Sequence, residues 1–123
     1  MNTDIKAVGT TLTPAITSYV TKRLEKIDHV LRDEGSMQCD VELKRTTNHH
    51  NKGDVFKADI HIVGHKQDIF ASSEKSDLYA AIDDAVDEAF HSVTSRRKKY
   101  MAMARRGGAR VKNMIKGLWP NRS

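Results

Sequence analysis

The sequence predicts an α+β domain of two layers, a four-stranded mixed sheet with two helices on one face. Two segments place apolar residues at helical spacing, and several shorter segments alternate between apolar and polar residues. The elements follow in the order strand, helix, strand, strand, strand, helix. Since the strands have one polar face, the sheet needs cover on only one side, which the two helices supply.

The first strand and the first helix are predicted at the start of the chain. Residues 4–8 lean apolar and precede a glycine and two threonines, which indicates a short strand. The helix begins at Thr13-Pro14, because a hydroxyl residue is favoured at the N-cap and proline at the first helical position. We expect it to end before Gly35. One helical face carries its apolar residues: Ile16, Val20, Leu24, Ile27 and Leu31.

The second strand has its apolar residues on one face. Cys39, Val41 and Leu43 alternate with charged residues, so we expect these three to be buried and Cys39 to be a small core residue. The strand–helix–strand unit that it completes is expected to cross over right-handedly. A polar loop is predicted at residues 46–53.

Two further strands complete the predicted sheet. Residues 56–63 alternate as the second strand does, and residues 68–72 form a shorter strand after a tight turn at Gly64-His65. We expect the last three strands to form an antiparallel meander.

The second helix is predicted over residues 76–100. At about 100° per residue, continuing its apolar stripe leads to Arg96, Arg97 and Tyr100. Because burying two arginines is costly, we expect the core to end near Val93 and the helix to overhang it. The apolar stripe consists of Leu78, Ile82, Val86, Ala89 and Val93.

Charge is distributed unevenly. The chain has 21 Lys and Arg and 16 Asp and Glu, a formal net charge of +5. Residues 1–90 hold 11 of these cations and all 16 anions, whereas residues 91–123 hold 10 cations and no anion. Such a cationic end is typical of a protein that binds nucleic acid or an anionic membrane surface. Complementing the helix dipole accounts for only about two charges in the last turn.

Two smaller charged surfaces are expected on the helices. Lys22, Lys26 and His29 should lie opposite the apolar stripe of the first helix, with Arg23 at its boundary. A solvated face and an RNA contact both remain open there. The acidic early part of the second helix should face solvent or a protein: Asp83, Asp84, Asp87 and Glu88.

Other classes of protein are disfavoured. No apolar run approaches the roughly 18 residues of a membrane span, and the first residues lack the pattern of a signal peptide. A single cysteine excludes an intrachain disulfide. No nucleophile motif, phosphate-binding glycine loop or metal-spaced Cys/His set stands out, and His49-His50 lack a third partner. We therefore expect no enzyme, no metal and no cofactor.

Residues 105–123 are expected to be a basic tail beyond a domain of residues 1–104. The paired glycines of Arg105-Arg106-Gly107-Gly108 favour the end of the helix, and Arg106-Gly107-Gly108 resembles an RGG element of RNA-binding tails. The tail is too short and too charged for a core of its own, so we expect it to become ordered on a partner. Trp119 could stack on a base or anchor the tail to its own domain.

The run Leu78-Tyr79-Ala80-Ala81-Ile82-Asp83, after a glycine hairpin and a short strand, resembles the signature of the ribosome hibernation-promoting factor family. That family includes the ribosome-associated translation inhibitor. The segment TLTPAITSYVTKRLEKIDHVL is similar to its first helix, and the resemblance covers roughly residues 4–104. It implies a cytoplasmic protein, monomeric off the ribosome, that binds the small ribosomal subunit in the channel of messenger and transfer RNA. There it would block translation and preserve idle ribosomes under stress or in stationary phase.

The resemblance also implies that basic residues of both helices face ribosomal RNA. Long members of the family carry a second domain that pairs two ribosomes, and this chain resembles the short members. Two alternatives stay open: a free RNA- or DNA-binding module, and a regulator that binds protein through the acidic half of the long helix. The expected RNA-binding residues, with the tail cations included, are Lys22, Arg23, Lys26, Arg96, Arg97, Lys98, Lys99, Arg105, Arg106, Arg110 and Lys112.

Overall fold

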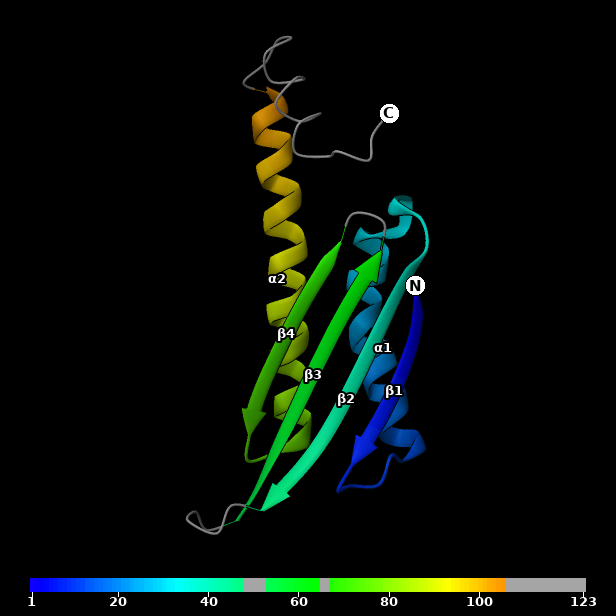
Figure 1. Cartoon of the computed structure of the whole chain (residues 1–123), viewed down its shortest axis with the longest axis vertical. Helices are drawn as coiled ribbons and strands as arrows, with labels where there is room; N and C mark the ends of the chain where they lie inside the picture. Colours follow the sequence, from blue (N-terminus) through cyan, green and yellow to red (C-terminus); the bar gives the residue numbers. More distant parts are fainter. Residues whose placement is uncertain (48–52, 65–66, 106–123) are drawn as a thin grey trace.

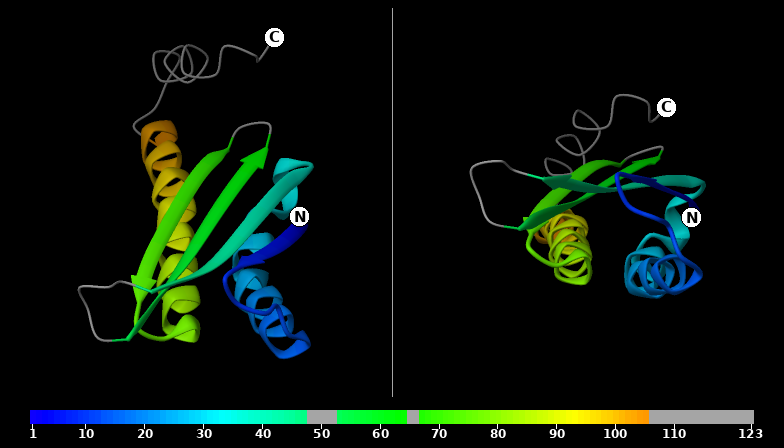
Figure 2. Two further views of the ribbon diagram at one scale, coloured as in Figure 1. Left: turned by 60° about the horizontal axis from the view of Figure 1, so that its bottom comes forward. Right: turned by 90° about the horizontal axis from the view of Figure 1, so that it is seen from below.

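A four-stranded sheet lies against two helices in the computed structural model of the chain, which describes residues 1–47, 53–64 and 67–105 (Figure 1). Seen end-on, both helices cover the same face of the sheet (Figure 2). The predicted fold class and element order are confirmed. The elements are β1 (Asn2–Val8), α1 (Pro14–Val30), the 3-10 turn η1 (Arg32–Glu34), β2 (Met37–Thr47), β3 (Asp54–Gly64), β4 (Asp68–Lys75) and α2 (Leu78–Arg105).

The sheet has the order β1-β2-β3-β4. β1 pairs with β2 in parallel, while β2, β3 and β4 form the expected antiparallel meander. β4 is longer than predicted, because Ser73 and its polar neighbours still pair with β3. The Ser73 hydroxyl is buried and donates to a carboxylate oxygen of Asp84 at 2.7 Å, which satisfies it under the helix. Because the last residues of β4 are polar, the alternation of apolar and polar residues does not predict the full length of the strand.

Helix α1 begins as its sequence predicts. The Thr13 hydroxyl oxygen accepts the backbone N–H of Ile16 at 3.2 Å, with Pro14 in the first turn. The helix ends at Val30, and the chain passes through η1 to Gly35, whose φ of 87° favours glycine. The turn therefore delivers β2 to the sheet beside β1.

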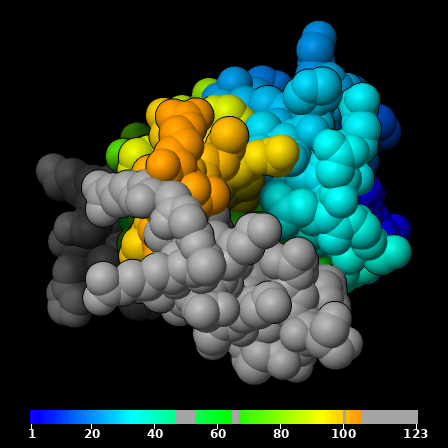
Figure 3. All heavy atoms as spheres, turned by 90° about the horizontal axis from the view of Figure 1, so that it is seen from above, coloured from blue at the N-terminus to red at the C-terminus, as the bar shows by residue number. Residues whose placement is uncertain are grey.

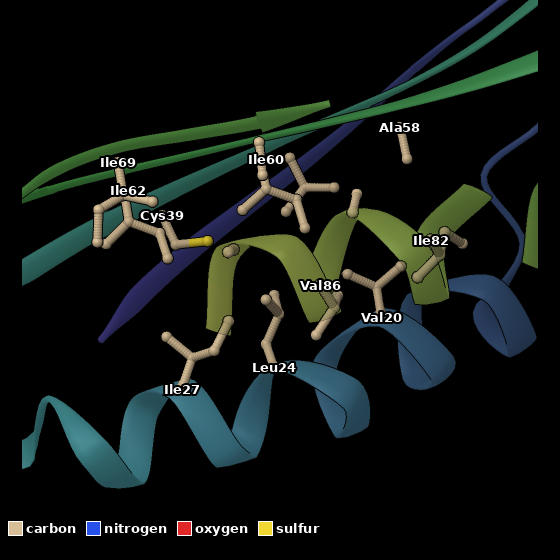
Figure 4. Packing of buried hydrophobic residues seen from close by; sticks show 14 of the residues in the cluster. Val20, Leu24, Ile27, Cys39, Ala58, Ile60, Ile62, Ile69, Ile82 and Val86 are labelled. Carbon is tan, nitrogen blue, oxygen red and sulfur yellow. The ribbon is translucent and has the colours of Figure 1, made fainter. Parts of the chain in front are cut away.

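The core lies between the helices and the inner face of the sheet (Figure 4). Every apolar residue that the sequence placed on the two helical stripes is buried, as are Cys39, Val41 and Leu43. Val93, which is 1% exposed, is the last residue of α2 in this core. The predicted end of the core near Val93 is confirmed.

Some predicted features differ or lie outside the described residues. β2 continues through Thr46 and Thr47, which pair with the start of β3, so the polar loop is shorter than expected. Residues 48–52, with His49-His50, are not among the described residues, and neither is His65 of the predicted turn. Gly64 donates its N–H to the carbonyl oxygen of Gln67 at 2.9 Å across that turn.

Cys39 provides a test of this core. Its side chain is 0% exposed, and burial raises the pKa of its thiol to about 12. Since the thiolate is the reactive species, a thiol reagent at about pH 8 should modify Cys39 only when the domain opens. We expect modification to be at least about a hundredfold slower in native buffer than in denaturant, because small domains open rarely. Equal rates in the two conditions would contradict the packing described here.

Candidate nucleic-acid interface

The two helices lie side by side and run in the same direction (Figure 1). The hydroxyl of Tyr19 donates to Asp83 at 2.5 Å near the start of α2. Near the other end of the pair, Arg97 meets the last residue of α1, Val30. Residues early in α1 therefore contact residues early in α2, and the C-terminal end of α1 lies beside the later turns of α2.

Two cations of α1 face α2. The Arg23 guanidinium places Nε 3.0 Å from Asp83 Oδ1 and Nη2 3.3 Å from Asp87 Oδ1. Lys26 Nζ lies 2.8 Å from Asp87 Oδ1 and 4.8 Å from the ring centroid of Phe90. The expectation that Lys26 lies opposite the apolar stripe was wrong. Asp83 and Asp87 do face solvent in part, with 41% and 59% of their side chains exposed, but they also bind the cations of α1, which the sequence pattern did not indicate.

The physical reason lies in where these charges stand relative to the apolar stripes. Arg23 and Lys26 flank the stripe of α1, and Asp83 and Asp87 flank the stripe of α2. Opposite charges that flank the stripes of neighbouring helices meet when the stripes face the same core, as they do beside coiled-coil seams. This signal is present in the sequence, but it becomes informative only when the two helices are known to be parallel neighbours.

These contacts shift two ionisation equilibria. The hydrogen bond from Lys26 is the main reason that the pKa of Asp87 is lowered, and the charge of Arg23 adds to it. The hydrogen bond to Asp83 raises the pKa of Tyr19. Tyr19 also packs edge-on against Tyr79, with ring centroids 4.8 Å apart. The helix pair is thus joined by a polar and aromatic contact along its outer side.

Beyond Val93, α2 leaves the core. Residues 94–105 extend for roughly 18 Å at about 1.5 Å per residue, and we call them the overhang. Asp68, the first residue of β4, lines the same shallow hollow as Ser95 and Arg96. The start of β4 therefore lies beside the turn of α2 at which the helix extends past the sheet. The overhang contains no acidic residue and five cations: Arg96, Arg97, Lys98, Lys99 and Arg105.

Arg97 is held more firmly than the sequence indicated. Its Nη1 donates to the carbonyl oxygen of Val30 at 2.6 Å and so caps the end of α1, where carbonyls lack partners within the helix. Arg97 is therefore exposed and at the same time bound to the end of α1. Its guanidinium carries five N–H donors, so this one bond leaves others for an external anion.

The overhang is cationic on all sides. Successive helical residues point about 100° apart, so four consecutive cations, from Arg96 to Lys99, surround the helix. All four are exposed. Viewed from above, the end of α2 lies next to the end of α1 and the segment that follows it (Figure 3). The described cations therefore form a basic tip rather than a flat basic face.

The remaining predicted site residues are placed as follows. Lys22 is exposed on α1, and Arg105 is exposed as the last described residue of α2. Arg106, Arg110 and Lys112 lie outside the described residues. Within residues 1–47, 53–64 and 67–105, no three metal-ligating side chains converge. No helix of that part of the chain is both long and apolar enough to cross a membrane.

Fold and charge together define a small α+β domain that ends in a cationic helical tip. The sequence profile described as Sigma 54 modulation protein / S30EA ribosomal protein matches residues 3–101, and the chain belongs to that family. The resemblance to the hibernation-promoting factor family is thereby confirmed. Among curated proteins, none matches the chain significantly.

Two solved structures are similar to this chain. One is the N-terminal domain of Protein Y from Thermus thermophilus, with 28% identity, a TM-score of 0.65, and coverage of 77% of this chain and 98% of that chain. The other is a ribosomal subunit interface protein from Coxiella burnetii, with 24% identity, a TM-score of 0.57, and coverage of 83% and 99%. The second likeness supports the fold alone.

The Lys26–Asp87 contact yields a prediction about stability. In the folded protein the pKa of Asp87 is lowered, so its contribution is present above the unfolded value of about 3.9 and is lost as pH falls through the folded pKa. Because the two side chains are 37% and 59% exposed, Asp87→Asn should lower the free energy of unfolding near neutral pH by only about 0.2–1 kcal/mol. Urea unfolding across this pH range measures it.

The matched control is Glu88→Gln, which removes a neighbouring exposed carboxylate of the same helix. We expect the control to leave stability unchanged within error and the effect of Asp87→Asn to vanish in acid. An Asp87→Asn effect that persists undiminished well below the folded pKa would show that the side chain acts through something other than its charge.

Proposed function

We propose that this protein is a ribosome hibernation factor. It binds the small ribosomal subunit in the channel used by messenger and transfer RNA, and thereby blocks translation and preserves idle ribosomes under stress or in stationary phase. It acts in the cytoplasm, as a monomer off the ribosome, and without catalysis. Family membership and the likeness to Protein Y support ribosome association. The observation that carries the proposal further is the overhang.

The shape of the overhang favours a channel over an open surface. A flat polyanion can be contacted by only one side of a helix, whereas Arg96–Lys99 surround theirs. A basic rod of this kind gains most where phosphates approach from several sides, and contacts to phosphates supply the bulk of affinity for RNA. Recognition should therefore depend on shape and phosphate positions more than on bases.

The residues proposed to bind RNA do not contribute equally. Lys22, Arg96, Lys98, Lys99 and Arg105 are exposed, and we assign the main phosphate contacts to them. Arg23 and Lys26 already neutralise carboxylates of α2, so an RNA phosphate would have to compete for them or share them. Arg97 contributes the donors that Val30 leaves unused. Arg106, Arg110 and Lys112 remain proposed contacts of the tail.

The two alternative functions are not equally well supported. A free RNA- or DNA-binding module would use the same cations, and comparable affinity for a naked RNA hairpin and for assembled small subunits would favour it. A regulator that binds protein through the acidic half of α2 is less well supported, because Asp83 and Asp87 are occupied by α1.

The decisive variant reverses two charges of the overhang and spares Arg97. Arg96→Glu/Lys99→Glu should reduce affinity for purified small subunits by at least about tenfold, since it removes two phosphate contacts and adds repulsion. Co-sedimentation through sucrose at low salt measures the binding, and circular dichroism checks the fold.

The matched control is Lys44→Glu/Lys57→Glu, which makes the same change in charge on the outer face of the sheet. We expect it to sediment with subunits nearly as the unaltered protein does. Equal loss in both double variants would mean that net charge alone drives binding, and full binding by the folded Arg96→Glu/Lys99→Glu protein would rule out the overhang as the main contact.

A further inference from the structure

The outer face of the sheet is not covered by either helix (Figure 2). Strand register places its outward side chains in rows that cross the four strands. One row joins Asp4, Asp40, His61 and Phe70, and the next row begins with Lys6 beside Glu42. The face is thus a regular array of charged residues with one exposed aromatic ring near its β4 edge.

Two carboxylates in this array form no ion pair with any residue that the structure describes. Asp4 and Asp40 are register partners on the parallel pair β1 and β2. The side-chain amide of Gln38 donates to Asp4 Oδ2 at 3.0 Å and to Asp40 Oδ1 at 2.9 Å, and neither carboxylate forms an ion pair with a described residue. Like charges on directly neighbouring strands are destabilising. By contrast, Glu42 has Lys44 at 2.9 Å.

The surface around Asp4 and Asp40 is concave. A shallow cavity of about 590 Å³ opens over these two carboxylates, and Phe70, which is 61% exposed, is among the residues that line it. The Phe70 ring packs edge-on against His61, with ring centroids 6.0 Å apart. A hollow lined mainly by carboxylates, with an exposed aromatic ring among them, suits a peptide that carries both cations and apolar side chains, and it repels RNA phosphates. Its polar and aromatic lining consists of Asp4, Lys6, Asp40, Glu42, Asp59, His61 and Phe70, so carboxylates outnumber the one lysine.

The chain contains such a peptide. Residues 106–123 hold five cations, no anion, and the chain's one tryptophan, Trp119. The segment follows the overhang, which carries it roughly 18 Å past the core. At about 3.3–3.6 Å per extended residue, it is long enough to return over the sheet. The positive charge of residues 106–123 and their extended length both favour this segment as the occupant of the hollow.

We propose that residues 106–123 dock on the outer face of the sheet in the free protein, with cations against Asp4 and Asp40 and Trp119 against Phe70. Of the two roles open to Trp119, the proposal takes the one in which it anchors the tail to its own domain. RNA phosphates and the carboxylates of the sheet compete for the same tail cations. The docked tail should therefore dissociate from the sheet only when it meets a dense array of phosphates. The docking itself does not depend on the proposed function.

The single tryptophan makes docking measurable without a label. We would record acrylamide quenching of Trp119 fluorescence in the full chain, without ribosomes. Quenching should be weaker than for N-acetyltryptophanamide and should increase by at least about twofold between about 0.1 M and 1 M salt, where the Debye length falls from about 10 to 3 Å. Asp4→Asn/Asp40→Asn should reproduce the increase at low salt. The fold should persist, because this change removes a like-charge repulsion.

The control is Asp33→Asn/Glu88→Gln, which deletes two exposed carboxylates from the helical side of the molecule. It should quench as the unaltered protein does. A charge exchange provides a second test. Asp4→Lys/Asp40→Lys and Arg110→Glu/Lys112→Glu should each increase the quenching of Trp119 by acrylamide. The protein that carries all four changes should again show weak quenching.

Three results would overturn the proposal. One is quenching that is the same in the unaltered and the Asp4→Asn/Asp40→Asn proteins. Another is an equal effect of the control. The third is protection that disappears on dilution, which would assign the tail to the sheet of a second copy. None of these results bears on ribosome binding, so failure here leaves the proposed function intact, and the reverse holds as well.

Discussion

Packing of α2 stops at Val93 because the sheet beneath it begins there, while the helix itself continues to Arg105. The rest of the structure depends on this mismatch of lengths. The buried part of α2 fixes the helix relative to four strands and to α1. Because the overhang continues the same helix, its direction is fixed as well, and its cations lie on a rigid helix instead of on a loop. Positioning on a rigid element is what a binding surface needs if geometry is to contribute to specificity.

The ion pairs between the helices support the same arrangement. Arg23, Lys26, Asp83 and Asp87 connect α1 to the early turns of α2, and Arg97 closes the end of α1 from the later turns. Each contact is partly exposed and individually weak. Together they set which side of each helix faces its neighbour. They also divide the helical surface into a neutralised part and a basic tip.

Much of this could be predicted from the sequence. Stripes such as Ile16 to Leu31 and Leu78 to Val93 predicted the core, because burial requires apolar residues at the period of the element. The length of β4 was missed, because Ser73 is a polar residue that is satisfied by Asp84, and alternation does not detect such residues. The partners of Lys26 and Arg97 were missed for a different reason. Both contacts join residues more than 60 positions apart, and the pattern of one helix does not say which helix lies next to it.

We propose that the overhang enters the channel of the small subunit. Tethered hydroxyl-radical probing from Lys99→Cys tests it most directly, and Cys39 provides a silent background because its thiol is buried. An overhang inside the channel should give cleavage of ribosomal RNA along the path of messenger and transfer RNA, and this cleavage should be lost when both are bound beforehand. Cleavage confined to the outer surface of the subunit, or unchanged by bound messenger and transfer RNA, would contradict it.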